Sequence, residues 1–111
     1  MKIQTQEYDD VVVVTLQGEL VVDADKMFQD TISQLISTGK KSIVLDMRGV
    51  GFIDGPGLEQ LLWVRDYCRE NHCQLKLAGL DENCEKILEI TRLDSEFDRY
   101  EELAKAVKSF V

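Results

Sequence analysis

Basic residues are outnumbered in this 111-residue sequence, which carries 13 Lys and Arg against 21 Asp and Glu. The formal net charge of −8 argues against a nucleic-acid-binding protein, because such proteins need a basic surface that neutralises phosphates. It also argues against attachment to anionic membranes by charge. An acidic chain of this kind is suited to partners that are other proteins.

Long hydrophobic runs are missing as well. The longest, residues 11–14, is far shorter than the ~20 apolar residues of a transmembrane helix, so we expect no direct membrane insertion. Residues 1–10 are polar and do not resemble an export signal. The three cysteines are an odd number without a repeated spacing. We therefore expect a cytoplasmic location in which the thiols stay reduced.

Proline occurs once, and no Gly/Ser/Pro-rich linker or internal repeat interrupts the chain. A domain typically has ~100–200 residues, so residues 1–111 are expected to form a single domain. A chain of this length can bury a core without disulfides or metals, which become necessary below roughly 40 residues.

The apolar pattern alternates between strands and helices. The β-branched run at 11–16 is typical of a buried strand, and the continuous apolar run at 42–47 of a strand covered on both faces. The order β-β-α-β-α-β-α-(β)-α predicts an α/β fold with a mixed sheet and flanking helices. Strands are expected at 3–8, 11–16, 42–47, 74–78 and near Phe97, and a loop is expected at 47–54. Helices are expected from Asp23 or Asp25 to Gly39, at 55–71, after Asp81 or Asn83, and at 101–110.

A thiol or imidazole site at the end of the helix 55–71 is one chemical possibility. Cys68 and His72 are four residues apart and share a helix face, with Cys73 next in the chain. However, no fourth zinc ligand has recognisable spacing, and a cysteine nucleophile also needs an oriented base. We interpret this segment as an ordinary helix end, and we expect no metal or cofactor.

Two carboxylates near the carboxyl edge of the sheet are a second possibility. Asp46 ends a predicted strand and Asp54 precedes a predicted helix, and ligand sites of α/β proteins favour that edge. The pair could hold Mg²⁺ or act as a base. The simpler interpretation is that each accepts backbone N–H bonds, as a helix cap does. We expect no catalytic residue and no enzyme, with a Mg²⁺-dependent activity as an alternative.

The segment 43–58, IVLDMRGVGFIDGPGL, resembles the signature of the STAS domain, in which a strand ending in Asp is followed by a short loop and Phe-x-Asp before a helix. The family comprises anti-sigma factor antagonists and the C-terminal domains of sulfate transporters. Gly18-Glu19-Leu20 is similar to a second family motif, and residues 87–104 are similar to its closing elements. The resemblance therefore covers essentially the whole chain.

The resemblance implies a small mixed α/β domain that binds a partner protein without catalysis. In the antagonist branch the partner is an anti-sigma factor that is also a serine kinase, and binding it regulates transcription. Phosphorylation of the hydroxyl residue after the motif Asp breaks that complex. The alternative implied by the family is an accessory subunit of a lipid-transporting ABC system, which binds the ATPase subunit.

The sequence departs from the family at the phosphorylated position, which is Gly55, and at the adjacent hydroxyl position, which is Pro56. Neither can take a phosphate, and no Ser or Thr occurs between Ser42 and Thr91. We therefore expect a signalling module without phosphorylation at the usual site. Val21 also stands where the family usually has Asp.

Helical geometry predicts a surface for the partner. At 100° per residue, Leu58, Leu61 and Cys68 face the core, whereas a stripe on the opposite side points outward. This stripe consists of Pro56, Glu59, Gln60, Trp63 and Tyr67. Trp and Tyr are frequent binding hot spots, although Trp63 could instead pack on a flanking helix. The expected partner-binding residues are Asp23, Asp54, Gly55, Pro56, Gly57, Gln60, Trp63 and Tyr67.

Overall fold

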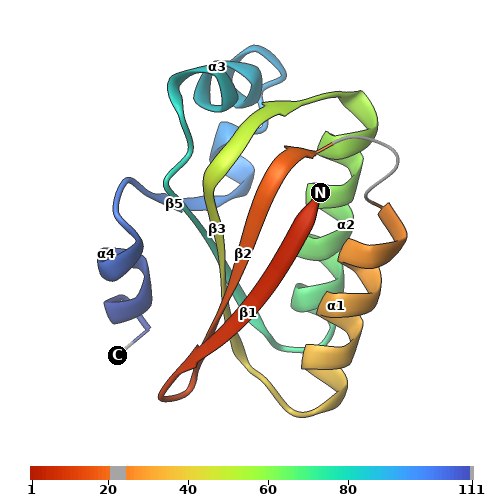
Figure 1. The fold of residues 1–111 in the computed structure, drawn as a ribbon, viewed down its shortest axis with the longest axis vertical. Helices are drawn as coiled ribbons and strands as arrows, with labels where there is room; N and C mark the ends of the chain where they lie inside the picture. Colours follow the sequence, from red (N-terminus) through yellow and green to blue (C-terminus); the bar gives the residue numbers. More distant parts are fainter. Residues whose placement is uncertain (21–24, 111) are drawn as a thin grey trace.

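The computed structural model describes residues 1–20 and 25–110, in which strands and helices alternate in the expected order (Figure 1). The strands are β1 (Lys2–Tyr8), β2 (Val11–Leu20), β3 (Ser42–Ile53), β4 (Gln74–Ala78) and β5 (Asp98–Tyr100). The helices are α1 (Asp25–Ser37), α2 (Gly55–Glu70), α3 (Glu82–Ile90) and α4 (Leu103–Lys108), and η2 (Asp94–Glu96) is a 3-10 turn. The predicted α/β class is confirmed. None of the helices in this described part is both long and apolar enough to cross a membrane.

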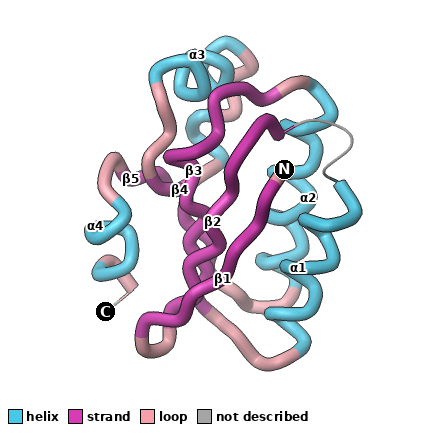
Figure 2. The backbone as a smooth tube through the Cα atoms, in the orientation of Figure 1, coloured by secondary structure: helices cyan, strands magenta, loops and turns pink. Residues whose placement is uncertain are grey.

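The five strands form one mixed sheet in the order β1-β2-β3-β4-β5. Strands β1 and β2 are an antiparallel hairpin, and the other neighbours are parallel. Each parallel connection passes through a helix, as a parallel crossover requires. Helices α1 and α2 lie side by side on one face, and α4 lies against the other face (Figure 2).

The valine run in β2 is buried on both faces of the sheet. Val12 and Val14 join the main core beneath α1 and α2, whereas Val11 and Val13 join a smaller cluster beneath α4. Successive strand residues point to opposite faces, so a continuous apolar run is stable only where both faces are covered. The sequence interpretation of this strand is confirmed.

Strand β3 is longer than predicted, and the expected loop at 47–54 is wrong. Its second half pairs with an equally extended β2, with Gly49 opposite Gln17 and Ile53 opposite Leu20. Gly49 permits this close pairing, because an added Cβ would lie 3.0 Å from the carbonyl oxygen of Leu16. The glycines in this segment resemble those of a loop, but hydrogen bonding to the distant strand β2 keeps the segment extended. Strand β3 therefore continues to the start of α2.

The last helix is shorter than the predicted range of 101–110, but its apolar side packs on the sheet as expected. Ala106 is buried there with Phe110 nearby. Beneath this segment lies Lys76, which is 8% exposed and whose Nζ is 4.3 Å from the Phe110 ring centroid. The same ammonium group donates a hydrogen bond to Ser109 Oγ at 2.5 Å. These contacts hold the C-terminal segment against the sheet.

Candidate functional site

The start of α2 is fixed by Asp54, which caps the helix. Its Oδ1 accepts a hydrogen bond from the Gly57 N–H at 2.8 Å, and its own N–H donates to the Leu20 carbonyl oxygen at 3.3 Å. Pro56 lies in the first turn, where a missing N–H costs no helix bond. The capping interpretation of Asp54 is confirmed, and the start of α2 is hydrogen-bonded to the end of β2.

The two glycines that flank Pro56 have opposite surroundings. Gly55 is exposed, and an added Cβ would meet no described atom within 4 Å. Gly57 is buried, and a Cβ there would lie 2.0 Å from the Leu20 carbonyl oxygen. Gly57 therefore lets α2 pack against the end of β2, and it lies beneath the expected binding surface rather than on it.

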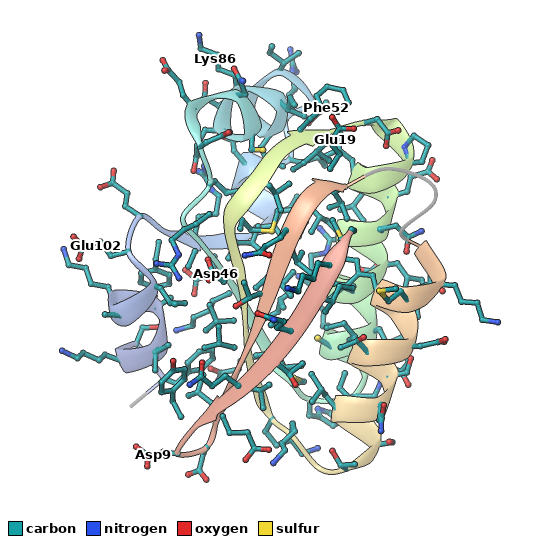
Figure 3. All side chains as sticks on the ribbon, viewed as in Figure 1. Asp9, Glu19, Asp46, Phe52, Lys86 and Glu102 are labelled. Carbon is teal, nitrogen blue, oxygen red and sulfur yellow. The ribbon has the colours of Figure 1, made fainter. Side chains whose placement is uncertain are left out.

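Phe52 is a surface residue that the sequence interpretation missed. Its side chain is 47% exposed, and it lies with Glu19 at the end of the sheet where α2 begins (Figure 3). Register shifts between β2 and β3 break the usual strand alternation, so no simple pattern predicts its orientation. One feature of the sequence could have identified Phe52: it is a large aromatic residue two positions before the helix cap at Asp54.

The predicted stripe on α2 is partly covered by the rest of the fold. Gln60 is 9% exposed and accepts a hydrogen bond from the side chain of Gln29 in α1 at 2.8 Å, so the prediction that it points outward is wrong. Trp63 and Tyr67 are stacked, with ring centroids 4.9 Å apart. Both are half-buried against the main core. Packing of α1 beside α2, which helical periodicity does not encode, is the reason for the difference.

One of the expected partner-binding residues, Asp23, lies outside the residues that the structure describes.

The carboxylates of Asp46 and Asp54 do not form a pair, contrary to the expectation that both lie at one sheet edge. Asp46 pairs with Thr15 and Ala78 inside the sheet, and β3 continues beyond it to Ile53. With ~3.3 Å per strand residue, the two carboxylates are separated by on the order of 20 Å. The arrangement therefore provides no shared site for Mg²⁺ or for acid–base chemistry.

Asp46 has a structural environment of its own. It is 1% exposed, and Arg48 donates two side-chain hydrogen bonds to its oxygens at 2.9 and 2.8 Å. Thr15 Oγ1 is 3.4 Å away. The hydrogen-bonded Arg48 guanidinium lowers the pKa of the Asp46 carboxyl, although burial acts in the opposite direction. The carboxylate is thus held ionised within the sheet by its partner.

The cysteines and the histidine are divided between two places. Cys84 is buried in α3, and burial raises the pKa of its thiol to about 12. Cys68 and Cys73 are buried at the end of α2, whereas the His72 side chain between them is exposed. Within residues 1–20 and 25–110, no three His, Cys, Asp or Glu side chains are placed to hold a metal ion.

The end of the molecule around α2 is therefore an open surface built on a rigid turn. It presents an exposed aromatic ring at Phe52 and a Gly-Pro pair with little side-chain cover, beside the exposed acidic residues Glu19 and Glu59. Surfaces that combine an aromatic anchor with charged surroundings are typical of protein contacts. The fold and the site together define a small α/β domain with a preformed surface at one sheet end.

Known proteins share this architecture. The STAS domain family matches residues 2–106, and a STAS-domain containing protein of Pseudomonas aeruginosa is 27% identical over 84 residues, which are 76% of this chain and 82% of that protein. The structure of a candidate anti-sigma factor antagonist from Thermotoga maritima has a TM-score of 0.88 at 21% identity, covering 96% of this chain and 92% of that chain. The Bacillus anti-sigma factor antagonist SpoIIAA, in its unphosphorylated form, has a TM-score of 0.82 at 19% identity and covers 98% of this chain and 96% of that chain.

The chain belongs to the STAS domain family. Its fold is that of the anti-sigma factor antagonists among the solved structures.

Proposed function

We propose that this chain is a non-catalytic module that binds a partner protein, an anti-sigma factor with a serine-kinase-like fold, and thereby regulates transcription. Membership of the STAS family and likeness in fold to SpoIIAA support this proposal. The observation that carries it is the exposed Phe52 ring beside the rigid turn at the start of α2.

The proposed docking surface consists of Phe52, Asp54, Gly55 and Pro56. Asp54 and the packing of α2 hold this turn in one conformation, which reduces the entropy that binding would otherwise cost. Gly55 lets a partner approach the backbone closely, and Phe52 supplies an aromatic anchor. Asp23, Trp63 and Tyr67 remain in the proposal as extensions of this surface.

Docking is proposed to lack the phosphorylation switch. SpoIIAA has been described in both an unphosphorylated and a phosphorylated form. Here Gly55 and Pro56 provide no hydroxyl group. A phosphate would add ~1.5–2 negative charges at such a helix start, so its absence removes an electrostatic way of releasing the partner. Control then depends on the abundance of the partners or on competition between them.

The test begins with capture of the partner by the tagged chain from native lysate, followed by calorimetry with that purified partner. Phe52→Ala is expected to weaken binding at least about tenfold, as truncation of an aromatic anchor does. The matched control is Tyr8→Ala. Tyr8 is 43% exposed and precedes Asp9, which lies at the opposite end of the sheet (Figure 3). Equal affinities for the two variants would contradict the proposed surface.

A second candidate function is that of an accessory subunit of a lipid-transporting ABC system, bound to its ATPase subunit. The absence of a hydroxyl group at Gly55 favours it equally, because a permanent subunit needs no phosphorylation-dependent release. The same capture experiment separates the two candidates. A serine-kinase-like protein supports the anti-sigma factor, and an ABC-type ATPase supports the transporter.

A further inference from the structure

Helix α2 ends in a backbone motif that places two cysteines against each other. The Cys73 N–H donates to the Cys68 carbonyl oxygen at 2.8 Å, and the His72 N–H donates to the Arg69 carbonyl oxygen at 3.3 Å. His72 has a φ of 57°. These are the two hydrogen bonds and the left-handed residue of a Schellman motif, in which the side chains at the positions of Cys68 and Cys73 usually touch.

The end of helix α3 shows which side chains usually occupy the two contacting positions of a Schellman motif. Its Leu93 N–H donates to the Leu88 carbonyl oxygen at 2.8 Å, and Arg92 has a φ of 60°. The same backbone motif there brings two leucines together, as the usual hydrophobic contact requires. At the end of α2 the apolar pair is replaced by two thiols, which can pack in the same way but are also chemically reactive.

The two thiols are buried but border a space that a small molecule can enter. Cys68 and Cys73 are 1% and 7% exposed, and both line a cavity of about 390 Å³. The charged side chains around this cavity are the basic Arg65 and Arg69 and the acidic Glu96 and Asp98, and Arg65 is paired with Glu96 at 2.5 Å. The cavity thus gives a small molecule access to the two sulfurs, and access is one requirement for a reactive cysteine.

The thiols are also unequal. The interaction with the neighbouring Cys68 thiol lowers the pKa of Cys73, burial opposes this effect, and the charge of Lys41 lowers the pKa as well. The same interaction, with burial, raises the pKa of Cys68. Lys41 lies close to this helix end, since its Nζ donates to the Asn71 carbonyl oxygen at 3.3 Å. Cys73 is therefore the better nucleophile of the two.

The backbone geometry permits a bond between the two sulfurs. A hydrogen bond of 2.8 Å that joins the two main chains limits the separation of the Cα atoms to less than about 7 Å, given standard bond lengths. Disulfides usually span Cα separations of roughly 4.4–6.8 Å. The separation of the two main chains is therefore compatible with a disulfide between Cys68 and Cys73.

We propose that Cys68 and Cys73 form a redox-active dithiol that hydroperoxides convert into an intramolecular disulfide. The Cys73 thiolate attacks the terminal peroxide oxygen: the S–O bond of a sulfenic acid forms, the O–O bond breaks, and the leaving hydroxide or alkoxide takes a proton to become water or an alcohol. The Cys68 sulfur then attacks the Cys73 sulfur: the S–S bond forms, the S–O bond breaks, and the leaving hydroxide takes the Cys68 proton and departs as water. The two sulfurs lose two electrons and the peroxide gains them, and a small dithiol reverses the reaction.

This site is separate from the proposed docking surface. The 16 residues of α2 span ~24 Å at 1.5 Å per residue; the helix begins at Gly55, and Cys68 lies in its last turn. A failure of the dithiol proposal therefore leaves the Phe52 experiment unaffected, and the reverse also holds.

The test treats the full chain with a small excess of hydrogen peroxide under native conditions. Free thiols are then blocked with N-ethylmaleimide in denaturant before digestion with trypsin. Trypsin cleaves after Arg69, between the two cysteines, so the disulfide joins peptides 66–69 and 70–76. We expect a loss of two mass units from the intact chain, these linked peptides, and full labelling of Cys84.

Variants test which cysteine attacks the peroxide and which one then forms the disulfide. Cys68→Ala is expected to abolish the linked peptides and to leave a sulfenic acid at Cys73 that dimedone traps. Cys84→Ala is the control and is expected to form the linked peptides as the wild type does. The proposal is overturned if oxidised wild-type protein contains no link between peptides 66–69 and 70–76, or if Cys84 is oxidised as fast as Cys73. Both of these outcomes are read on the wild-type chain and do not depend on a variant folding.

Discussion

Gly55 and Gly57 show that the role of a glycine depends on the atoms packed around it. At Gly55 an added Cβ would meet open space, whereas at Gly57 it would collide with the Leu20 carbonyl oxygen. The first glycine thus leaves the surface uncovered, and the second allows α2 to approach β2. The two glycines are separated by a single residue, Pro56, and the three-dimensional packing gives them different roles.

Asp46 leads to a prediction about pH. The pKa of its carboxyl is lowered in the folded state, so its contribution to stability is complete above its unfolded value of ~3.9 and is lost as the pH falls through the lower folded value. Asp46→Asn is expected to lower the free energy of unfolding by ~1–2 kcal/mol at pH 7. This difference from the wild type should shrink between pH 4 and pH 2, as measured by urea unfolding.

The control for Asp46→Asn is Asp10→Asn, which removes the same charge from an exposed turn residue. Asp10→Asn is expected to change the free energy of unfolding by less than ~0.5 kcal/mol. A deficit of Asp46→Asn that remains the same at pH 7 and pH 2 would show that the ion pair with Arg48 does not stabilise the fold.

At the scale of elements, α2 combines three roles along its length. Its first turn is fixed by Asp54, its middle packs beside α1 through Gln60, and its last turn holds the cysteine pair. Predicting the helix required only its caps and apolar spacing. Predicting which side faces α1 required the position of α1 on the sheet, and this is why the orientation of Gln60 was mispredicted.

Trp63→Ala tests the middle of α2. The ring stacks on Tyr67 and packs on the core, so the substitution is expected to lower the free energy of unfolding by ~2 kcal/mol, somewhat less than for a fully buried Trp. Urea unfolding measures the loss, with the exposed Tyr8→Ala as the comparison. A decrease in the free energy of unfolding of less than ~0.5 kcal/mol would contradict a stabilising role for the packing of Trp63. Trp63 would then remain a candidate for partner binding alone.

At the scale of the whole molecule, the missing hydroxyl group at Gly55 and Pro56 leads to a prediction about phosphorylation. Incubation of the wild-type chain with ATP and the serine-kinase-like protein proposed as its partner is expected to give no shifted band on a Phos-tag gel. Gly55→Ser is expected to give one, because the position has open space for a side chain and the family's acceptor hydroxyl is then restored. Gly55→Ala is the control for the change in size.

The outcome that contradicts this prediction is a shifted band of the wild type that maps to residues 55–58. A shift mapping elsewhere would instead reveal a different regulatory site. Gly55→Ser carrying a phosphate should also bind the partner more weakly than its unmodified form, since the added charge and bulk would lie on the proposed docking surface.

The sequence by itself determined the order of the strands and helices, the two-sided burial of the β2 valines, the cap at Asp54 and the lack of a hydroxyl group at Gly55 and Pro56. Each of these depends on local periodicity, on a cap residue or on the presence of one chemical group. Only the tertiary structure decided the length of β3, the exposure of Phe52, the separation of Asp46 from Asp54 and the inward position of Gln60. These depend on contacts between segments far apart in the chain, which no local pattern encodes.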